Sequence, residues 1–244
     1  MRSFRTFSWK DTHLKVYGRE YEQITGAVID ERKKLEAYIQ RHPEFKSALT
    51  PLELLHDAPE VALRMARASQ STGLGPMASV AGTLAQFGVE AAQAVGCQEA
   101  IVENGGDLYI MSPTPVTIGI YAGDNSIGAQ LAFHILPEEL PLAICSSSSK
   151  MGHSLSFGHC ELATVVARDA ALADSAATLV CNRISSEADV TQVLEEVGQI
   201  EGIRGILVVK NSKIGLWGTL PQLVRNQDNE TLAKITRDPN SGFK

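Results

Sequence analysis

The sequence predicts an α+β fold, with antiparallel strands and hairpins packed against helices in a single large domain. Helical patterns gather in blocks instead of alternating one by one with strands, and several β-rich runs are joined by short turns. Hydrophobic residues make up 44% of the 244 positions and charged residues 20%, which is the composition of a globular chain with a core of its own. We assign residues 1–225 to this domain and residues 226–244 to a polar C-terminal tail with the composition of a mobile segment.

The N-terminal part of the chain begins with two strands and continues with helices. Residues 5–10 and 12–18 predict strands around a turn at Lys10 and Asp11. Three helices are then expected: an exposed amphipathic one at 27–42 that ends before Pro43, a second amphipathic one at 58–72, and one at 76–95 that is rich in small and apolar residues. The composition of the third helix predicts that it is buried on all sides, in a core or at a subunit interface.

The remaining residues change from a helical period to a strand period and back. Residues 99–111 predict two strands about the turn Gly105-Gly106. Further strands are expected at 116–123, 129–136, 141–147 and 161–167, where β-branched residues are frequent. An alanine-rich helix at 168–184 has Asp169 as its N-cap candidate. A weaker helix at 190–200 and a hairpin at 203–218 complete the expected order.

Charge and cysteine usage narrow the class of protein. The net charge is −6 and no dense run of Lys or Arg occurs, which argues against nucleic acid as a partner. No window reaches the roughly 18 consecutive apolar residues of a membrane span, and the start of the chain lacks the apolar core of a secretory signal. None of the four cysteines forms a C-x-x-C pair. We therefore expect a cytoplasmic protein with reduced thiols, for which a homo-oligomer stays open.

The stretch "SSSSKMGHSLSFGHC", residues 146–160, carries Gly152-His153-Ser154-Leu155, which looks like the start of a hydrolase nucleophile elbow. Ser156 stands where that motif needs glycine, and strand-like residues follow where a helix is needed. A hydrolase using Ser154 with His153 or His159 is therefore disfavoured. The serine hydroxyls suit a loop that holds a polar ligand, and a solvated loop fits the same residues equally well.

Two helical stretches suggest ligand binding. "STGLGPMASVAG" formally matches a dinucleotide fingerprint at Gly73, Gly75 and Ala78, but a helix precedes it where that fingerprint needs a strand. A helix start at Pro76 can still bind an anion, although an ordinary turn between helices explains the same residues. In "ALADSAATLV", Asp174 and Thr178 are four residues apart and share one face among alanines. They suit a half-site for Mg²⁺, or a buried hydrogen bond between the two side chains.

Together these stretches resemble the ApbE superfamily, the FAD:protein FMN transferases. "ALADSAAT" resembles the family's late A-D-A-x-x-T helix motif, and "VENGGDLYI" resembles its N-x-G-G-D strand-turn. "GPMASVAG" resembles more weakly its G-x-I-A-K-G helix start, and "CSSSSKMGHS" occupies the place of its T-S-G loop. The motifs cover residues 70–185, and "GHSLSFG" is typical of a cytosolic ApbE-like branch.

The resemblance implies a site and a reaction. Asp174, Thr178 and the carbonyl of Ala78 would bind Mg²⁺ and carry catalysis. The flavin-nucleotide pocket would be lined by residues from three segments: Gly75, Met77, Asn104, Gly105, Gly106, Asp107, Ser147, Ser148 and His153. FAD would be the ligand or substrate, and a Ser or Thr hydroxyl of a partner protein would accept FMN with release of AMP.

The chain also departs from the family pattern. Ser79 stands where the family has lysine, and "GHSLSFGHC" replaces its H-I-x-D-P-x-x-G segment. The early acidic segment of the family has no clear counterpart. These differences keep a second interpretation open, in which the chain is a non-catalytic ApbE-like module that binds a flavin, another nucleotide or an anion.

Overall fold

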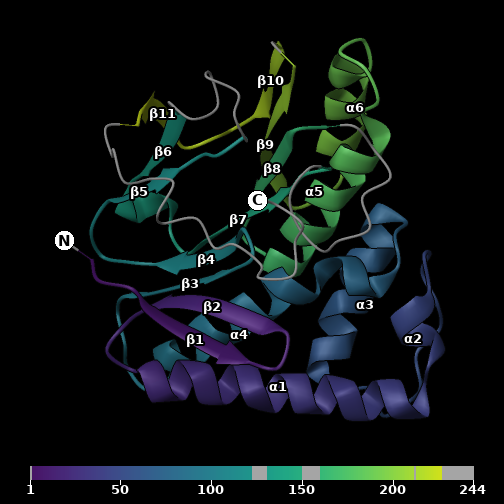
Figure 1. Cartoon of the computed structure of the whole chain (residues 1–244), viewed down its shortest axis with the longest axis vertical. Helices are drawn as coiled ribbons and strands as arrows, with labels where there is room; N and C mark the ends of the chain where they lie inside the picture. Colours follow the sequence, from purple (N-terminus) through teal and green to yellow (C-terminus); the bar gives the residue numbers. More distant parts are fainter. Residues whose placement is uncertain (1, 123–130, 150–159, 212, 227–244) are drawn as a thin grey trace.

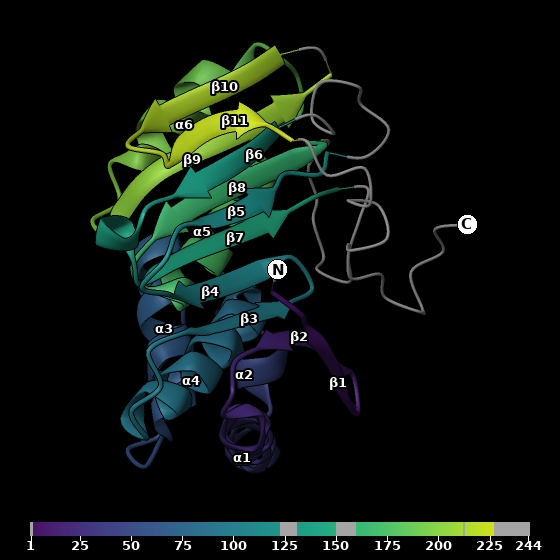
Figure 2. The ribbon, with the colours of Figure 1, turned by 90° about the vertical axis from the view of Figure 1, so that its left-hand side faces the viewer.

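The computed structural model describes residues 2–122, 131–149, 160–211 and 213–226. The chain forms three layers, with helices on one face of a large antiparallel sheet and a small sheet on the other face (Figures 1 and 2). The large sheet has eight strands in the order β1-β2-β3-β4-β7-β8-β9-β10, and the small sheet has three in the order β11-β6-β5. This architecture confirms the predicted α+β fold with antiparallel pairing.

The strands and helices have the following bounds. The strands of the large sheet are β1 (Arg5–Trp9), β2 (Thr12–Tyr17), β3 (Ala100–Asn104), β4 (Asp107–Met111), β7 (Leu142–Ser147), β8 (Leu162–Ala167), β9 (Ile203–Lys210) and β10 (Lys213–Gly218). The small sheet contains β5 (Val116–Gly119), β6 (Leu131–Ile135) and β11 (Gln222–Arg225). The main helices are α1 (Tyr21–Arg41), α2 (Glu44–Ser47), α3 (Glu60–Thr72), α4 (Val80–Ala94), α5 (Ala170–Arg183) and α6 (Asp189–Gly198). A 3-10 turn, Pro76–Ser79, precedes α4.

Alternation along the central strands produces two cores. In β7, Ala143 and Cys145 pack into the core under the helices, whereas Leu142 and Ile144 pack into the core between the two sheets. Because both faces of these strands are covered, the strands are apolar along nearly their whole length. The helix-side face is the one on which the candidate site is built.

The prediction of a helix buried on all sides was wrong for 76–95. Its first residues form the 3-10 turn, and in α4 Gln86 and Glu90 are half-exposed while Gln93 is exposed. The helix that is buried along most of its length is α5, where every residue from Ala170 to Thr178 is buried. Alanines allow α5 to lie close to the sheet and to α3 and α4, because a short side chain permits close approach of two backbones.

The boundaries of the helices and strands agree with the prediction at one helix cap and differ from it elsewhere. Asp169 caps α5 by accepting a hydrogen bond from the Leu172 N–H at 2.9 Å, as predicted. Helix α1 begins at Tyr21 rather than at residue 27, and its buried face includes Ile24. The short helix α2, which buries Phe45, and the strand β11 were not predicted.

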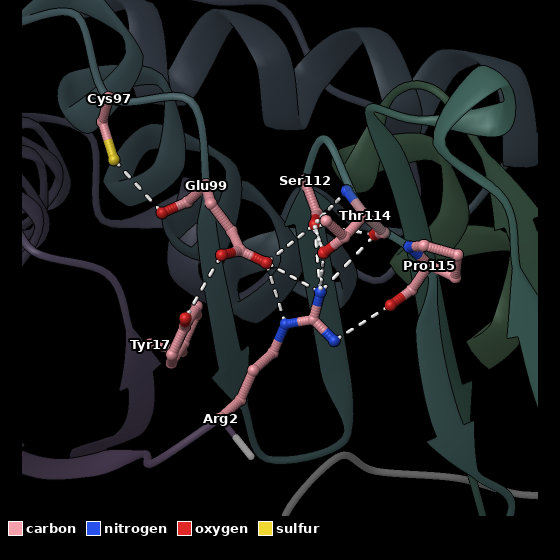
Figure 3. Close-up of polar contacts among 7 residues, drawn as sticks. All are labelled: Arg2, Tyr17, Cys97, Glu99, Ser112, Thr114 and Pro115. Atoms are coloured by element: carbon pink, nitrogen blue, oxygen red, sulfur yellow. Dashed lines mark hydrogen bonds and ion pairs between the residues drawn. The ribbon is translucent and has the colours of Figure 1, made fainter.

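The N-terminus is fastened at the end of β3 that lies opposite to Asn104 (Figure 3). Arg2 donates from Nε and Nη2 to Glu99 Oε1 at 2.9 and 2.7 Å, and its Nη1 donates to the Pro115 carbonyl at 3.0 Å. Burial alone would raise the pKa of Glu99, but the hydrogen bonds from Ser112 and Arg2 lower it by more, so the pKa lies below its ordinary value.

Within the described ranges, no helix has the length and apolar character needed to cross a bilayer.

Candidate functional site

One edge of the large sheet collects polar residues. Strand β3 ends at Asn104, β4 begins at Asp107, and β7 ends at Ser147. Because these neighbouring strands are antiparallel, the three positions lie at the same edge. In each strand, the residue two positions away packs into the core under the helices, as Tyr109 does for Asp107 and Cys145 for Ser147. Residues two apart in a strand point to the same face, so the side chains of Asn104, Asp107 and Ser147 also face the helices.

The turn between β3 and β4 depends on two glycines. Gly105 has φ +66° and Gly106 has φ +105°, both in the left-handed region that glycine enters without strain. The turn pairs Asn104 directly with Asp107, and the Gly106 N–H donates to the Glu103 carboxylate at 2.8 Å. The Gly-Gly-Asp motif therefore has a structural function, which is to place an amide and a carboxylate side by side at the sheet edge.

Asp174 of α5 reaches the first turn of α4. Its Oδ2 accepts a hydrogen bond from the Gly82 N–H at 2.8 Å, which is one of the donors that the start of a helix leaves without an intrahelical acceptor. Asn104 contacts the same turn, because its Nδ2 donates to the Ala81 carbonyl at 3.1 Å. The first turn of α4 thus lies between the hairpin motif and the Asp174 motif, which are far apart in the sequence.

Two buried carboxylates, Asp107 and Asp174, interact at this edge. Burial raises the pKa of Asp174 to about 7, against the lowering effect of the Gly82 and Ala81 N–H groups. Burial and the neighbouring charge of Asp174 raise the pKa of Asp107, although its Oδ1 accepts from the Ser146 N–H at 3.2 Å. Among the described residues, no Lys or Arg forms an ion pair with either carboxylate. Without a cation, one of the pair is therefore expected to hold a proton near neutral pH.

The donor chemistry of this cluster fits a hard cation. Asp107, Asp174 and Asn104 offer oxygen, and Thr178 lies one turn beyond Asp174 and is also buried. The Ser147 hydroxyl is buried and has no hydrogen-bond partner in the described part of the chain. Mg²⁺ takes oxygen ligands and completes its shell with phosphate and water. A site with three His, Cys, Asp or Glu ligands does not occur in the described ranges, so such a cation would depend on neutral oxygens as well.

The alternative of a buried Asp174–Thr178 hydrogen bond is not what holds Asp174. Both side chains lie in the described chain, and no hydrogen bond joins them. The carboxylate of Asp174 instead accepts hydrogen bonds from backbone N–H groups of α4. Ser175, between them, pairs its hydroxyl with Thr72 of α3 at 2.7 Å. The serine of this helix therefore packs against α3, and the Asp174 carboxylate is left to the first turn of α4.

The structure gives Gly75 a packing function. A Cβ at this position would lie 1.8 Å from the Ala48 carbonyl oxygen, so glycine is required by a backbone contact. Gly73, with φ +77°, ends α3 in the left-handed conformation. The Gly-x-Gly pattern is thus explained by a turn between helices. A ligand contact for Gly75 stays a prediction.

The other predicted residues lie near this turn or outside the described ranges. Met77 packs against the helix-side core, and Ala78 donates its N–H to the Gly75 carbonyl at 3.1 Å. Ser79, where the family has lysine, is buried and donates to the Pro76 carbonyl at 3.0 Å. Ser148 is half-buried beside Ser147. The predicted ligand residue His153, with Ser154 and His159 of the disfavoured hydrolase, lies outside the described residues.

The sequence did not indicate two residues of the cluster. Cys145 is buried near Asp107 and Asp174, and burial together with the charges of these two carboxylates raises the pKa of its thiol. Strand alternation would have placed it on the same face as Ser147. Gly82 has no comparable signal, because its close contacts to Asp174 and Ala170 exist only in the folded chain.

Comparisons with known proteins agree with this architecture. The family model described as "AbpE bacteria" matches residues 6–200. The UPF0280 protein of Methanocella arvoryzae is 41% identical over 237 residues, which cover 96% of each chain. The UPF0280 protein of Methanocaldococcus jannaschii is 36% identical over 91% of this chain and 90% of its own.

Solved structures show the same fold at low identity. The flavinyl transferase ApbE of Pseudomonas stutzeri has a TM-score of 0.58 and 13% identity, covering 90% of this chain and 94% of its own. The flavin transferase ApbE of Vibrio cholerae also has a TM-score of 0.58, with 10% identity over 90% of this chain and 97% of its own. The family match, the relatives and the shared fold confirm the resemblance read from the motifs. The chain belongs to the family described as AbpE bacteria and, with its relatives, to the UPF0280 proteins, an ApbE-like branch.

Proposed function

We propose that this protein binds a flavin dinucleotide together with Mg²⁺ at the polar edge of the large sheet, and that it transfers FMN from FAD to a hydroxyl of a partner protein. One observation carries the proposal, which is the buried pair Asp107 and Asp174 without a cationic side chain beside it in the described chain. A buried pair of like charges is costly unless a cation or a proton compensates it. A divalent cation would remove this cost and would at the same time attract a pyrophosphate.

The neutral groups around the pair support an anionic ligand bound through the cation. Ser79 occupies the position of the family's lysine and is engaged with the backbone, so this position supplies no positive charge to a phosphate. Ser147 offers a buried hydroxyl that the described chain leaves without a partner, and such a group gains most from a ligand's hydrogen bond. Thr178 and the carbonyl of Ala78 complete the set of oxygens that the family resemblance assigns to the metal.

The reaction would follow from this arrangement. Bound Mg²⁺ supplies neutralisation of the pyrophosphate charge. The oxygen of the acceptor Ser or Thr forms a bond to the phosphorus of the FMN half, and the P–O bond to the AMP half breaks, so that AMP leaves with the electron pair. The acceptor hydroxyl would lose its proton to Asp107, which the neighbouring cation would keep ionised and therefore able to accept it. Asp174 would hold the cation, and the hydrogen bond that it accepts from the Gly82 N–H would fix the position of its carboxylate.

The second candidate is a binding module without transfer. It is favoured by Ser79 in place of lysine and by "GHSLSFGHC" in place of the family's H-I-x-D-P-x-x-G segment. Such a module would hold a flavin, another nucleotide or an anion through the same carboxylates. Tight, Mg²⁺-dependent binding without any product distinguishes it from the transferase.

The test is a transfer assay with product detection at both ends. FAD, Mg²⁺ and a serine- or threonine-containing acceptor protein are incubated with the wild type and with Asp174→Asn. AMP is measured by chromatography, and covalent flavin by fluorescence of the denatured acceptor. We expect AMP and labelled acceptor in equal amounts with the wild type and neither with the variant. Equal AMP release by both proteins would contradict the proposal, and flavin binding without AMP across a panel of acceptors would favour the binding module.

A further inference from the structure

Two buried cysteines meet where α5 contacts the start of β8. Cys160 and Cys181 are both fully buried, and the Cys181 thiol lies 3.9 Å from the carbonyl oxygen of Cys160. The Cys160 thiol in turn lies 3.2 Å from the Leu162 carbonyl and 3.5 Å from the Val209 carbonyl. The Cys181 thiol and burial both raise the pKa of Cys160, which agrees with the short distance between the Cys181 thiol and the Cys160 backbone.

The contact is specific to this pair. All four cysteines lie in the described chain, and none is in a disulfide. Cys97 donates to the Glu99 carbonyl at 3.1 Å, near the fastening of the N-terminus. Cys145 contacts the Ala170 carbonyl at 3.7 Å, at the beginning of α5, which is ~16 Å along the helix from Cys181 at about 1.5 Å per residue. Neither can reach the Cys160–Cys181 pair without a large rearrangement.

The pair joins two elements of the candidate site. Cys160 is also tied to the end of β7, because its carbonyl accepts from the Ser149 N–H at 3.0 Å and from the Ser149 hydroxyl at 2.7 Å. Cys181 lies one turn beyond Thr178 on α5, the helix that carries Asp174. A covalent bond between the cysteines would therefore connect that helix to the base of the segment that follows β7.

We propose that Cys160 and Cys181 form an intramolecular disulfide when the protein is exposed to a low-molecular-weight disulfide such as oxidised glutathione. The thiolate of one cysteine attacks a sulfur of the small disulfide and releases one small thiol. The thiolate of the second cysteine then displaces the other small thiol and forms the protein S–S bond. Two protein thiols are oxidised, one small disulfide is reduced to two thiols, and two protons are transferred in the exchange. Since both sulfurs are buried, the exchange proceeds through local opening.

The arrangement of trypsin sites makes the test direct. Cleavage after Lys150, Arg168 and Arg183 puts Cys160 alone in the peptide 151–168 and Cys181 alone in 169–183. Cys97 and Cys145 share one peptide, 68–150. The full chain is incubated with oxidised glutathione, both natively and during refolding from guanidinium, then alkylated, digested without reduction and analysed by mass spectrometry.

We expect the cross-linked pair of peptides 151–168 and 169–183, together with a loss of two of the four thiols that react in denaturant. The closed loop spans 21 residues, so the oxidised protein should melt about 6–12 °C higher than the reduced one, and dithiothreitol should reverse the shift. Cys181→Ser should abolish the cross-link, and Cys97→Ser should leave it intact. A cross-link to peptide 68–150, a lower melting temperature on oxidation, or no cross-link even after refolding would overturn the proposal.

Discussion

Gly82 offers the sharpest test of how the site is assembled, through the variant Gly82→Ala. A Cβ at this position would lie 2.5 Å from the Ala170 carbonyl oxygen and 2.9 Å from the Asp174 Cβ. Both distances are too short for real contacts, so α4 or α5 must shift. Gly→Ala inside a helix otherwise stabilises a protein by about 0.5–1 kcal/mol. Overpacking costs about 1–3 kcal/mol, and we therefore expect a net loss of about 1–2 kcal/mol.

Gly26→Ala is the matched control for this variant. Gly26 lies inside α1, and a Cβ there would meet nothing within 4 Å. The same chemical change should therefore stabilise the protein by about 0.5–1 kcal/mol, because only the helix propensity changes. Opposite signs for the two alanines are the expected result.

The assay is urea unfolding followed by circular dichroism, with the two variants and the wild type measured side by side. In thermal unfolding of a chain of this size, a loss of about 1–2 kcal/mol in the free energy of unfolding corresponds to a melting temperature lower by about 2–8 °C. Gly82→Ala should also weaken any Mg²⁺-dependent ligand binding, because it moves the carboxylate of Asp174. If Gly82→Ala is as stable as the wild type or more so, the close packing of α4 on α5 is not as described and the reasoning fails.

Three further predictions concern charges. The pKa of Asp174 is about 7 in the metal-free protein, so Mg²⁺ must displace a proton from this carboxyl at low pH. The affinity of the protein for Mg²⁺, measured by calorimetric titration, should therefore fall about tenfold from pH 8 to pH 6. An unchanged affinity would contradict this prediction. Asp107→Asn removes one of two buried like charges, so the metal-free variant should melt no lower than the wild type at pH 8. The rise in melting temperature that Mg²⁺ produces in the wild type should be lost in this variant. A persisting rise would show that Asp107 does not contribute to the cation site. Glu99 has a pKa below its ordinary value of 4.5, so its ion pair with Arg2 stabilises the fold above pH 4.5 and is lost as the pH falls through the lowered pKa. The difference in stability between the wild type and Arg2→Ala should therefore shrink on acidification. A constant difference would refute the assignment.

Local signals in the sequence predicted much of the fold. The Gly105-Gly106 turn and the N-cap Asp169 were predicted correctly because each depends on a residue and its immediate neighbours. The short helix at Phe45 was missed because four residues carry no measurable period. The buried helix was assigned to 76–95 rather than to α5, because composition alone does not reveal which helix the sheet covers.

The candidate site was predicted in its parts and not in its assembly. Asp107 and Asp174 were both selected, one for the nucleotide and one for the metal, but their electrostatic interaction arises only when β4 and α5 meet. Gly82 and Cys145 complete the cluster through contacts that no motif encodes. Gly75, selected for an anion, is required by its backbone contact with Ala48, and its ligand contact stays a prediction. Long-range packing therefore determines which of the candidate groups act together.

The central claim is that a cation and a flavin dinucleotide bind together at the Asp107–Asp174 pair. The most direct measurement is calorimetric titration of FAD into metal-free protein, with and without Mg²⁺, for the wild type and Asp174→Ala, with Gly26→Ala in α1 as a control variant outside the cluster. We predict FAD binding that requires Mg²⁺, that is lost in Asp174→Ala, and that is retained in Gly26→Ala. FAD binding of equal strength without Mg²⁺ or in Asp174→Ala, or no binding under any of these conditions, would contradict the account.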